Sequence, residues 1–195
     1  MAIKKYSKVK FTLRKELVMI LAAIVVLVVA TILLNLPTKE EKFVNKWAEA
    51  GAQITENELY VEVSFDELQD ELSGKQAGEY TFVLFTTPSD ADGVTYFNTV
   101  ISLAELYGVE KVYLVDSEFV VGKDREEDSD FDAELKDIED NFKTEEGTEM
   151  KLDAVSNFWV FNGDTLVDCT DNYAVNDTPN WGLALVQMLS YAKAN

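Results

Sequence analysis

The most prominent feature of the hydrophobic pattern is one long apolar run near the start of the chain. Residues 17–36 read LVMILAAIVVLVVATILLNL and contain no charged side chain. As an α-helix, a segment of this length extends about 30 Å, which matches the hydrocarbon core of a bilayer. The pattern therefore predicts a single transmembrane anchor over residues 17–36.

Two other interpretations of this run fit less well. A secretory signal peptide has an apolar core of about 7 to 15 residues and ends at a small-x-small cleavage site. Here the run is longer, and Asn35, Leu36, Pro37 and Thr38 follow with neither such a site nor a cysteine for lipid attachment. A buried helix of a soluble protein is rarely apolar over this length. An uncleaved anchor is the expectation.

The segment after the apolar run, residues 37–58, predicts a separate helix. Pro37 should end or kink the preceding helix. Thr38 and Glu41 have the spacing of an N-terminal capping box, and an apolar stripe that includes Trp47 follows. We expect a juxtamembrane helix or stalk, which lies near the membrane surface or packs on the domain that follows.

From residue 59 onward, the apolar period switches between two and 3.6, which is typical of alternating strands and helices. The pattern predicts strands over 59–63, 80–86, 111–116, 157–161 and 165–169, and helices over 64–72, 93–107, 124–149 and from about Pro179 onward. The second and third of these strands are nearly continuous apolar runs, as in central strands buried on both faces. A helix between them predicts parallel pairing through a right-handed crossover. Asn162-Gly163-Asp164 predicts an antiparallel hairpin between the last two strands.

Charge is divided unevenly on the two sides of the apolar run. Residues 1–16 hold six basic side chains and one acidic one, a charge of +5; the whole chain is at −19, which leaves −24 for the remainder. Positive flanks stay on the cytoplasmic side of a membrane. We therefore expect a cytoplasmic basic tail over residues 1–16, a bilayer-embedded anchor over 17–36 and an extracytoplasmic domain over 59–195. Such an acidic surface argues against nucleic acid as a partner.

Composition removes most catalytic chemistries. The chain has no histidine and one cysteine, Cys169, so it lacks His-based acid/base catalysis, His-dependent triads, Cys/His zinc sites and any intramolecular disulfide. Cys169 lies in LVDCTD, a predicted strand, where a lone cysteine is more often a packing residue than a nucleophile. Carboxylate chemistry, or no chemistry, remains.

Two stretches of the predicted domain carry a family resemblance. In FVLFTTPSDADGVTYF, a buried strand is followed by a short proline-containing loop and a helix; in VSNFWVFNGDTLVD, a strand, an Asn-Gly turn and a second strand follow one another. Their order and spacing resemble the thioredoxin-like superfamily over about residues 59–192. The chain looks closest to membrane-anchored or exported bacterial members of that superfamily. The resemblance implies an α/β domain with a central mixed sheet flanked by helices.

The residues that would perform thioredoxin chemistry are missing from these stretches. Depending on the register, the two cysteine positions of the C-x-x-C motif fall on Ser89 and Asp92, or on Asp90 and Gly93. Dithiol exchange requires a thiolate, which neither a hydroxyl nor a carboxylate replaces. The family's cis-proline would fall at Ser156, where a trans peptide is expected because a cis bond costs about 2.5–4 kcal/mol without proline.

The loop before the second helix of the domain is the candidate binding site. Its members are Pro88, Ser89, Asp90, Ala91 and Asp92, with Ser156 expected beside them. Hydroxyl and carboxylate side chains at a helix start commonly cap the first-turn amides. Acid/base work by two carboxylates would instead need a pKa strongly raised by burial. We expect no catalytic residue, no cofactor and no metal ligand here.

A second polar pattern lies in the acidic segment. Asp128, Asp130, Asp132 and Glu139 stand at positions 1, 3, 5 and 12 of a calcium-binding EF loop. Ala133 occupies the position that requires glycine, and the apolar residues of the segment already follow a helical stripe. A solvated acidic face over residues 124–149 is the simpler interpretation.

Together these features predict a noncatalytic, redox-inactive thioredoxin-like module on the outer face of a bacterial cytoplasmic membrane. Its partner would be a protein of the cell envelope, contacted by residues 88–92 and by the acidic face. One alternative is an accessory factor for peptide export or an envelope thiol pathway that holds clients noncovalently, a role similar to that of bacteriocin-transport accessory proteins. Another is a calcium-binding acidic domain.

Overall fold

The structure is a computed structural model that describes residues 15–54, 59–117, 142–148, 156–175 and 178–193. The chain divides into two compact units, Met1–Lys39 and Glu40–Asn195. The expected calcium-loop pattern and most of the acidic segment lie outside the described residues. The units are described separately below.

The described part of the first unit contains helix α1, Lys15–Leu34. Every described side chain of α1 is exposed, although the helix is rich in leucine, isoleucine and valine. Near its end, the Thr31 hydroxyl donates to the Leu27 carbonyl, and the side-chain amide of Asn35, just after the helix, donates to the Thr31 carbonyl. Within the residues that the structure describes, no helix combines the length and the hydropathy that crossing a bilayer requires.

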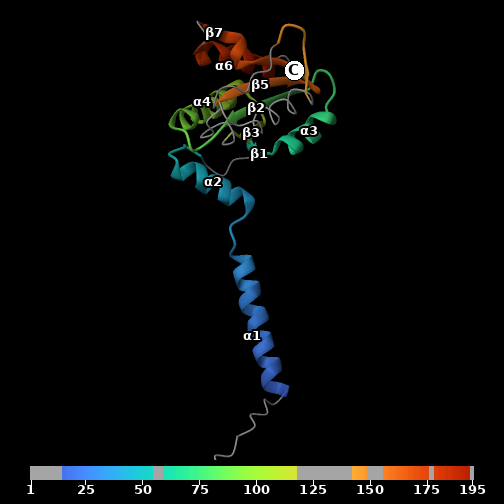
Figure 1. Cartoon of the computed structure of the whole chain (residues 1–195), viewed down its shortest axis with the longest axis vertical. Coiled ribbons are helices and arrows are strands. Elements are labelled where there is room, and N and C mark those ends of the chain that lie inside the picture. Colours follow the sequence, from blue (N-terminus) through green and yellow to red (C-terminus); the bar gives the residue numbers. More distant parts are fainter. Residues whose placement is uncertain (1–14, 55–58, 118–141, 149–155, 176–177, 194–195) are drawn as a thin grey trace, which may run out of the picture. The chain divides into compact units, whose positions relative to one another are not determined.

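The second unit is an α/β domain built on a mixed sheet (Figure 1). Its larger elements are α2 (Lys39–Glu49), β1 (Tyr60–Glu62), α3 (Phe65–Ser73), β2 (Tyr80–Thr86), α4 (Ala91–Tyr107), β3 (Val112–Asp116), β5 (Asn157–Asn162), β6 (Thr165–Cys169) and α6 (Trp181–Leu189). Shorter ones are β4 (Lys143–Thr144), β7 (Ala174–Val175), β8 (Thr178–Pro179) and the 3-10 turns η2 (Thr170–Tyr173) and η3 (Ser190–Lys193).

The main sheet has the strand order β1-β3-β2-β5-β6-β4. β1, β3 and β2 are parallel, whereas β5 is antiparallel to both β2 and β6. The predicted parallel strand-helix-strand unit, β2-α4-β3, and the predicted hairpin, β5-β6, are both present. An α/β domain with a mixed sheet flanked by helices is therefore confirmed.

Helices cover both faces of the sheet, which explains the continuous apolar runs in its central strands. In β2, Phe82 and Leu84 face the core under α4 and α6, while Val83 and Phe85 face the core under α3. This alternation is the period of two that a pleated strand imposes. A central strand such as β2 thus contributes side chains to the hydrophobic cores on both faces of the sheet.

Helix α2 belongs to the core of the second unit. Phe43 and Trp47 are buried, and the Trp47 indole stacks on Phe97 of α4 at 4.4 Å between ring centroids. Lys46 of the same helix forms an ion pair with Asp116 at the end of β3. The segment expected to be a juxtamembrane stalk therefore contributes a helix to the domain.

Two predicted elements differ from the structure. Residues 143–144, inside the expected acidic helix, form β4, which pairs in parallel with β6; sheet pairing outweighs the helical pattern there. The last helix begins at Trp181 rather than at Pro179. Pro179 lies in β8, where it pairs with Ala174 of β7. The Asn180 side chain caps the helix by accepting a hydrogen bond from the Leu183 amide at 3.2 Å.

Candidate functional site

The loop between β2 and α4 is shaped by its own polar groups. Asp90 is the N-cap of α4, and its carboxylate accepts a hydrogen bond from the Gly93 amide at 2.8 Å. The Ser89 amide donates to the Thr87 hydroxyl at 3.3 Å. Capping satisfies one of the free amides that begin every helix. The carboxylate at this position therefore does structural work.

The candidate loop residues differ in their access to solvent. Ser89, Ala91 and Asp92 are exposed, whereas Pro88 and Asp90 are half-buried. Among the described residues, the Asp92 carboxylate takes part in no hydrogen bond or ion pair. An approaching molecule would meet Ser89, Ala91 and Asp92 first.

Ser156 lies beside this loop but inside the protein. Its side chain is at hydrogen-bond distance from Thr86, with 3.0 Å between the two hydroxyl oxygens, and it is only 5% exposed. Among the described residues no peptide bond is cis; residue 155 lies outside them. Ser156 therefore contacts the end of β2, and because it is buried it offers almost no surface to a partner.

Gly93 allows the first turn of α4 to approach the end of β2. A Cβ atom at this position would lie 2.7 Å from the Thr86 hydroxyl oxygen and 2.7 Å from the Thr87 carbonyl oxygen. Thr86 is fully buried and adjoins Ser156, so it has little room to move. Any side chain at 93 would collide with this buried pair, and the position admits only glycine without rearrangement.

An aromatic pair that the sequence analysis did not identify lies one helical turn beyond Asp92. Tyr96 of α4 stacks on Trp181 of α6 at 4.1 Å between ring centroids, with both side chains half-buried. Burial raises the pKa of the Tyr96 phenol, and the carboxylates of Asp92 and Asp90 raise it further. The only sequence signal was the spacing of four between Asp92 and Tyr96, which places both on one helix face.

The one cysteine of the sequence lies away from the loop. Cys169 ends β6 and is fully buried. Burial raises the pKa of its thiol to about 11. The preceding residue, Asp168, is also buried and accepts hydrogen bonds from the Tyr173 hydroxyl at 2.6 Å and from the Asn172 amide at 3.0 Å. Cys169 is therefore a packing residue with little thiolate character.

We expect the folded protein to resist thiol reagents. Because the thiolate is the nucleophile, a pKa of about 11 together with burial should slow the reaction of Cys169 with a disulfide reagent at neutral pH by at least ~100-fold relative to the denatured chain. Absorbance of the released thiol measures this rate. The denatured chain serves as the control, and equally fast labelling of the folded chain would contradict the assignment.

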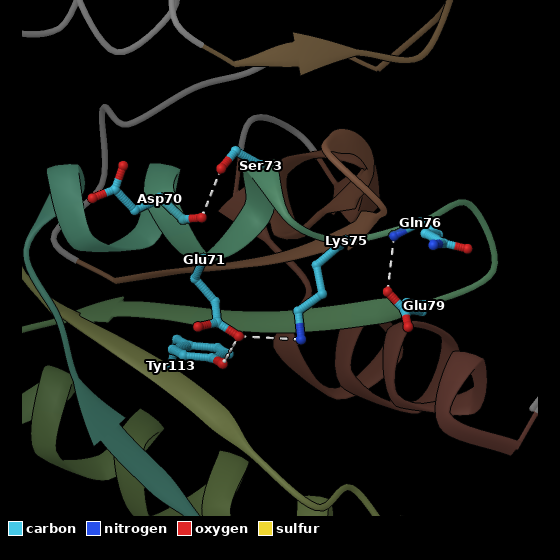
Figure 2. Close-up of polar contacts among 7 residues, drawn as sticks. All are labelled: Asp70, Glu71, Ser73, Lys75, Gln76, Glu79 and Tyr113. Atoms are coloured by element: carbon cyan, nitrogen blue, oxygen red, sulfur yellow. Dashed lines mark hydrogen bonds and ion pairs between the residues drawn. The ribbon is translucent and has the colours of Figure 1, made fainter.

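A second polar cluster ties α3 to β3. The Tyr113 hydroxyl donates to Glu71 Oε1 at 2.6 Å, and Lys75 Nζ lies 3.1 Å from the same oxygen. Figure 2 shows both side chains approaching this carboxylate. The hydrogen bond from Tyr113 and the one from Lys75 hold the pKa of Glu71 below its usual range. Burial raises the pKa of Tyr113. Every group here has a partner, so the cluster fits a structural tie rather than a reactive site.

Replacing Tyr113 by phenylalanine should cost about 1 kcal/mol, because Glu71 loses its donor while the ring remains. Glu71, whose folded pKa is depressed, adds stability above its unfolded pKa that is lost as pH falls through the folded pKa. The variant should therefore show less acid-dependent loss in that window, measured by denaturant titration at several pH values. Tyr107→Phe, whose hydroxyl has no partner among the described residues, is the control and should change neither quantity.

One pocket among the described residues lies on the side of the sheet that α3 covers. A cavity of about 130 Å³ lies between α3 and β4, lined by Gln69, Leu72, Ser73, Phe142, Lys143 and Asp164. Small-molecule sites usually measure about 300–1,000 Å³. Within the described ranges, no three acidic or cysteine side chains gather as a metal site would require.

No protein-family model, curated protein or solved structure matches the chain.

Proposed function

We propose that this protein is a noncatalytic, thioredoxin-like binding module held on the outer face of a bacterial cytoplasmic membrane. In this proposal the exposed loop residues Ser89, Ala91 and Asp92 contact a protein of the cell envelope. The main support for a noncatalytic role is the start of α4. There the Asp90 carboxylate accepts a hydrogen bond from the Gly93 amide, at a place where a dithiol enzyme needs sulfur. The sequence's one thiol, Cys169, is buried in β6.

The thioredoxin-like assignment is supported by strand order and by placement. The parallel strands β1, β3 and β2, followed by the antiparallel hairpin β5-β6 and a final helix, are compatible with that fold. In this proposal the loop after β2 corresponds to the redox motif, and Ser156, whose hydroxyl adjoins that of Thr86, corresponds to the family's proline. The contact between Ser156 and the end of β2 supports the proposed fold.

The membrane anchor rests on the sequence pattern. Residues 17–36 are uncharged and follow a tail of charge +5. The described side chains of α1 are exposed and largely apolar. Large exposed apolar surfaces mark sites of contact with a membrane or another protein, and a lipid bilayer would bury this one.

Site-specific crosslinking tests the binding role. A photo-reactive amino acid at Ser89 of the full chain, expressed in cells, should form adducts with a distinct protein. The same amino acid at Ser73, which is exposed on α3 on the other face of the sheet, is the matched control and should not. Absence of adducts from Ser89, or the same adducts from both positions, would refute the loop as the contact surface.

Two further measurements test the remaining parts of the proposal. The full chain should reduce insulin no faster than a blank, and reduction that is abolished by Cys169→Ser would overturn the noncatalytic assignment. In spheroplasts, added protease should degrade the domain while residues 1–16 stay protected. Recovery of the intact chain in the soluble fraction would overturn the anchor.

A further inference from the structure

The surface next to the loop combines aromatic faces with unpaired negative charge. The rings of Tyr96 and Trp181 stack with an angle of 21° between their planes. Both side chains are half-buried, near the starts of α4 and α6. Asp92 precedes Tyr96 by one turn of the same helix, and both Asp92 and Asp90 act electrostatically on the Tyr96 phenol. We call Asp92, Tyr96 and Trp181 the aromatic ledge.

No positive charge of its own two helices neutralises the ledge. Residues 91–107 and 181–189 contain neither lysine nor arginine. At the ledge the helix pair therefore offers a carboxylate and aromatic surface, and neither helix supplies a basic side chain to pair with them.

We infer that the aromatic ledge binds a lysine or arginine side chain in a basic segment of a protein partner. A cation is attracted to the face of an aromatic ring, and an adjacent carboxylate adds to this attraction. The inference rests on the proposed binding role and names the chemistry of the partner. Arginine fits best, since its planar guanidinium stacks on an aromatic face while it donates to a carboxylate.

Charge also selects among possible occupants. The chain beyond residue 16 has a charge of −24, so a second copy of this domain or an acidic protein would be repelled. A basic segment is attracted over the whole surface and is fixed in place at the ledge. The chain's own basic tail, residues 1–16, is the competing occupant that the experiment must distinguish.

The test uses the full chain in a neutral detergent and a short fluorescein-labelled peptide in which arginine alternates with leucine. Anisotropy measures affinity, and acrylamide quenching of tryptophan emission reports the place. Trp47 and Trp159 are fully buried, so Trp181 should account for the quenchable emission. The peptide should protect Trp181 from acrylamide, whereas the same peptide with glutamate in place of arginine should not.

Two charge-matched variants decide the outcome. Asp92→Asn should weaken peptide binding by about threefold to tenfold, while Asp70→Asn, which removes an exposed carboxylate from α3, should change it less than twofold. Trp181→Leu, which keeps an apolar side chain, should weaken binding as Asp92→Asn does. Equal weakening by Asp92→Asn and Asp70→Asn would reduce the effect to diffuse attraction and overturn the inference.

The remaining outcomes separate this inference from the proposed function. Tighter peptide binding after neutralisation of the lysines in residues 1–16 would make the chain's own tail the occupant, and would overturn a separate partner at the ledge. Specific adducts from Ser89 together with binding that is insensitive to Asp92→Asn would defeat the ledge alone. Ledge binding without adducts from Ser89 would defeat the loop contact alone.

Discussion

Replacing Trp47 by alanine is expected to destabilise the domain by about 3–5 kcal/mol, the largest effect of any single substitution considered. The indole is 0% exposed and stacks on Phe97. Its removal would leave a cavity where α2 meets α4. Denaturant unfolding of the full chain in neutral detergent, followed by circular dichroism, measures the loss.

Trp47→Phe is the matched variant and should cost only ~1 kcal/mol. Phenylalanine keeps an aromatic ring against Phe97, and the indole N–H that it removes has no acceptor among the described residues. A buried donor without an acceptor is unfavourable, so its loss offsets part of the lost packing. If Trp47→Ala were as mild as Trp47→Phe, α2 would not belong to the core.

Replacing Gly93 by alanine should destabilise the domain by about 1–3 kcal/mol, although glycine-to-alanine changes inside helices usually stabilise by about 0.5–1 kcal/mol. The added Cβ would lie 2.7 Å from both the Thr86 hydroxyl oxygen and the Thr87 carbonyl oxygen. Neither atom can withdraw easily, because Thr86 adjoins buried Ser156 and the Thr87 oxygen is backbone. Denaturant unfolding checks the sign as well as the size of the change.

Gly182→Ala supplies the control for this prediction. Gly182 is also helical, but it is exposed, and its nearest neighbour to a Cβ would be the Asn180 side-chain oxygen at 3.8 Å. Because nothing crowds a Cβ there, the substitution should be neutral or stabilising. If both substitutions stabilised the domain equally, the loop would accommodate a Cβ atom at position 93 without cost, which would contradict the prediction.

Elements with a strong local signal could be predicted from the sequence. Strand β2 coincides with the apolar run over 80–86, because a strand covered on both faces must be apolar at nearly every position. The capping box at Ser64 and Glu67 set the start of α3, where both reciprocal hydrogen bonds are present. These signals lie within a few residues of one another, so no knowledge of the fold is needed.

Features that depend on distant residues could not be predicted. The stacking of Tyr96 on Trp181 joins helices that are far apart in the sequence, and neither residue alone indicates it. The same holds for the burial of Ser156, whose hydroxyl contacts that of Thr86, 70 residues earlier in the sequence. The resemblance offers Gly93 as one of two alternative positions for a motif cysteine, whereas the contacts around it show that glycine there permits close packing.

The hairpin between β5 and β6 also bears on how the protein ages. An asparagine followed by glycine is prone to deamidation, in which the glycine amide nitrogen attacks the asparagine side chain. Here the Gly163 amide donates to the Glu79 carbonyl at 3.0 Å, and the Asn162 side-chain oxygen accepts from the Gly78 amide at 2.6 Å. Because the Gly163 amide and the Asn162 side chain are both held by hydrogen bonds, loss of ammonia from Asn162 requires the turn to open. Deamidation, seen as a mass increase after hydrolysis, would therefore report how often this turn opens during storage.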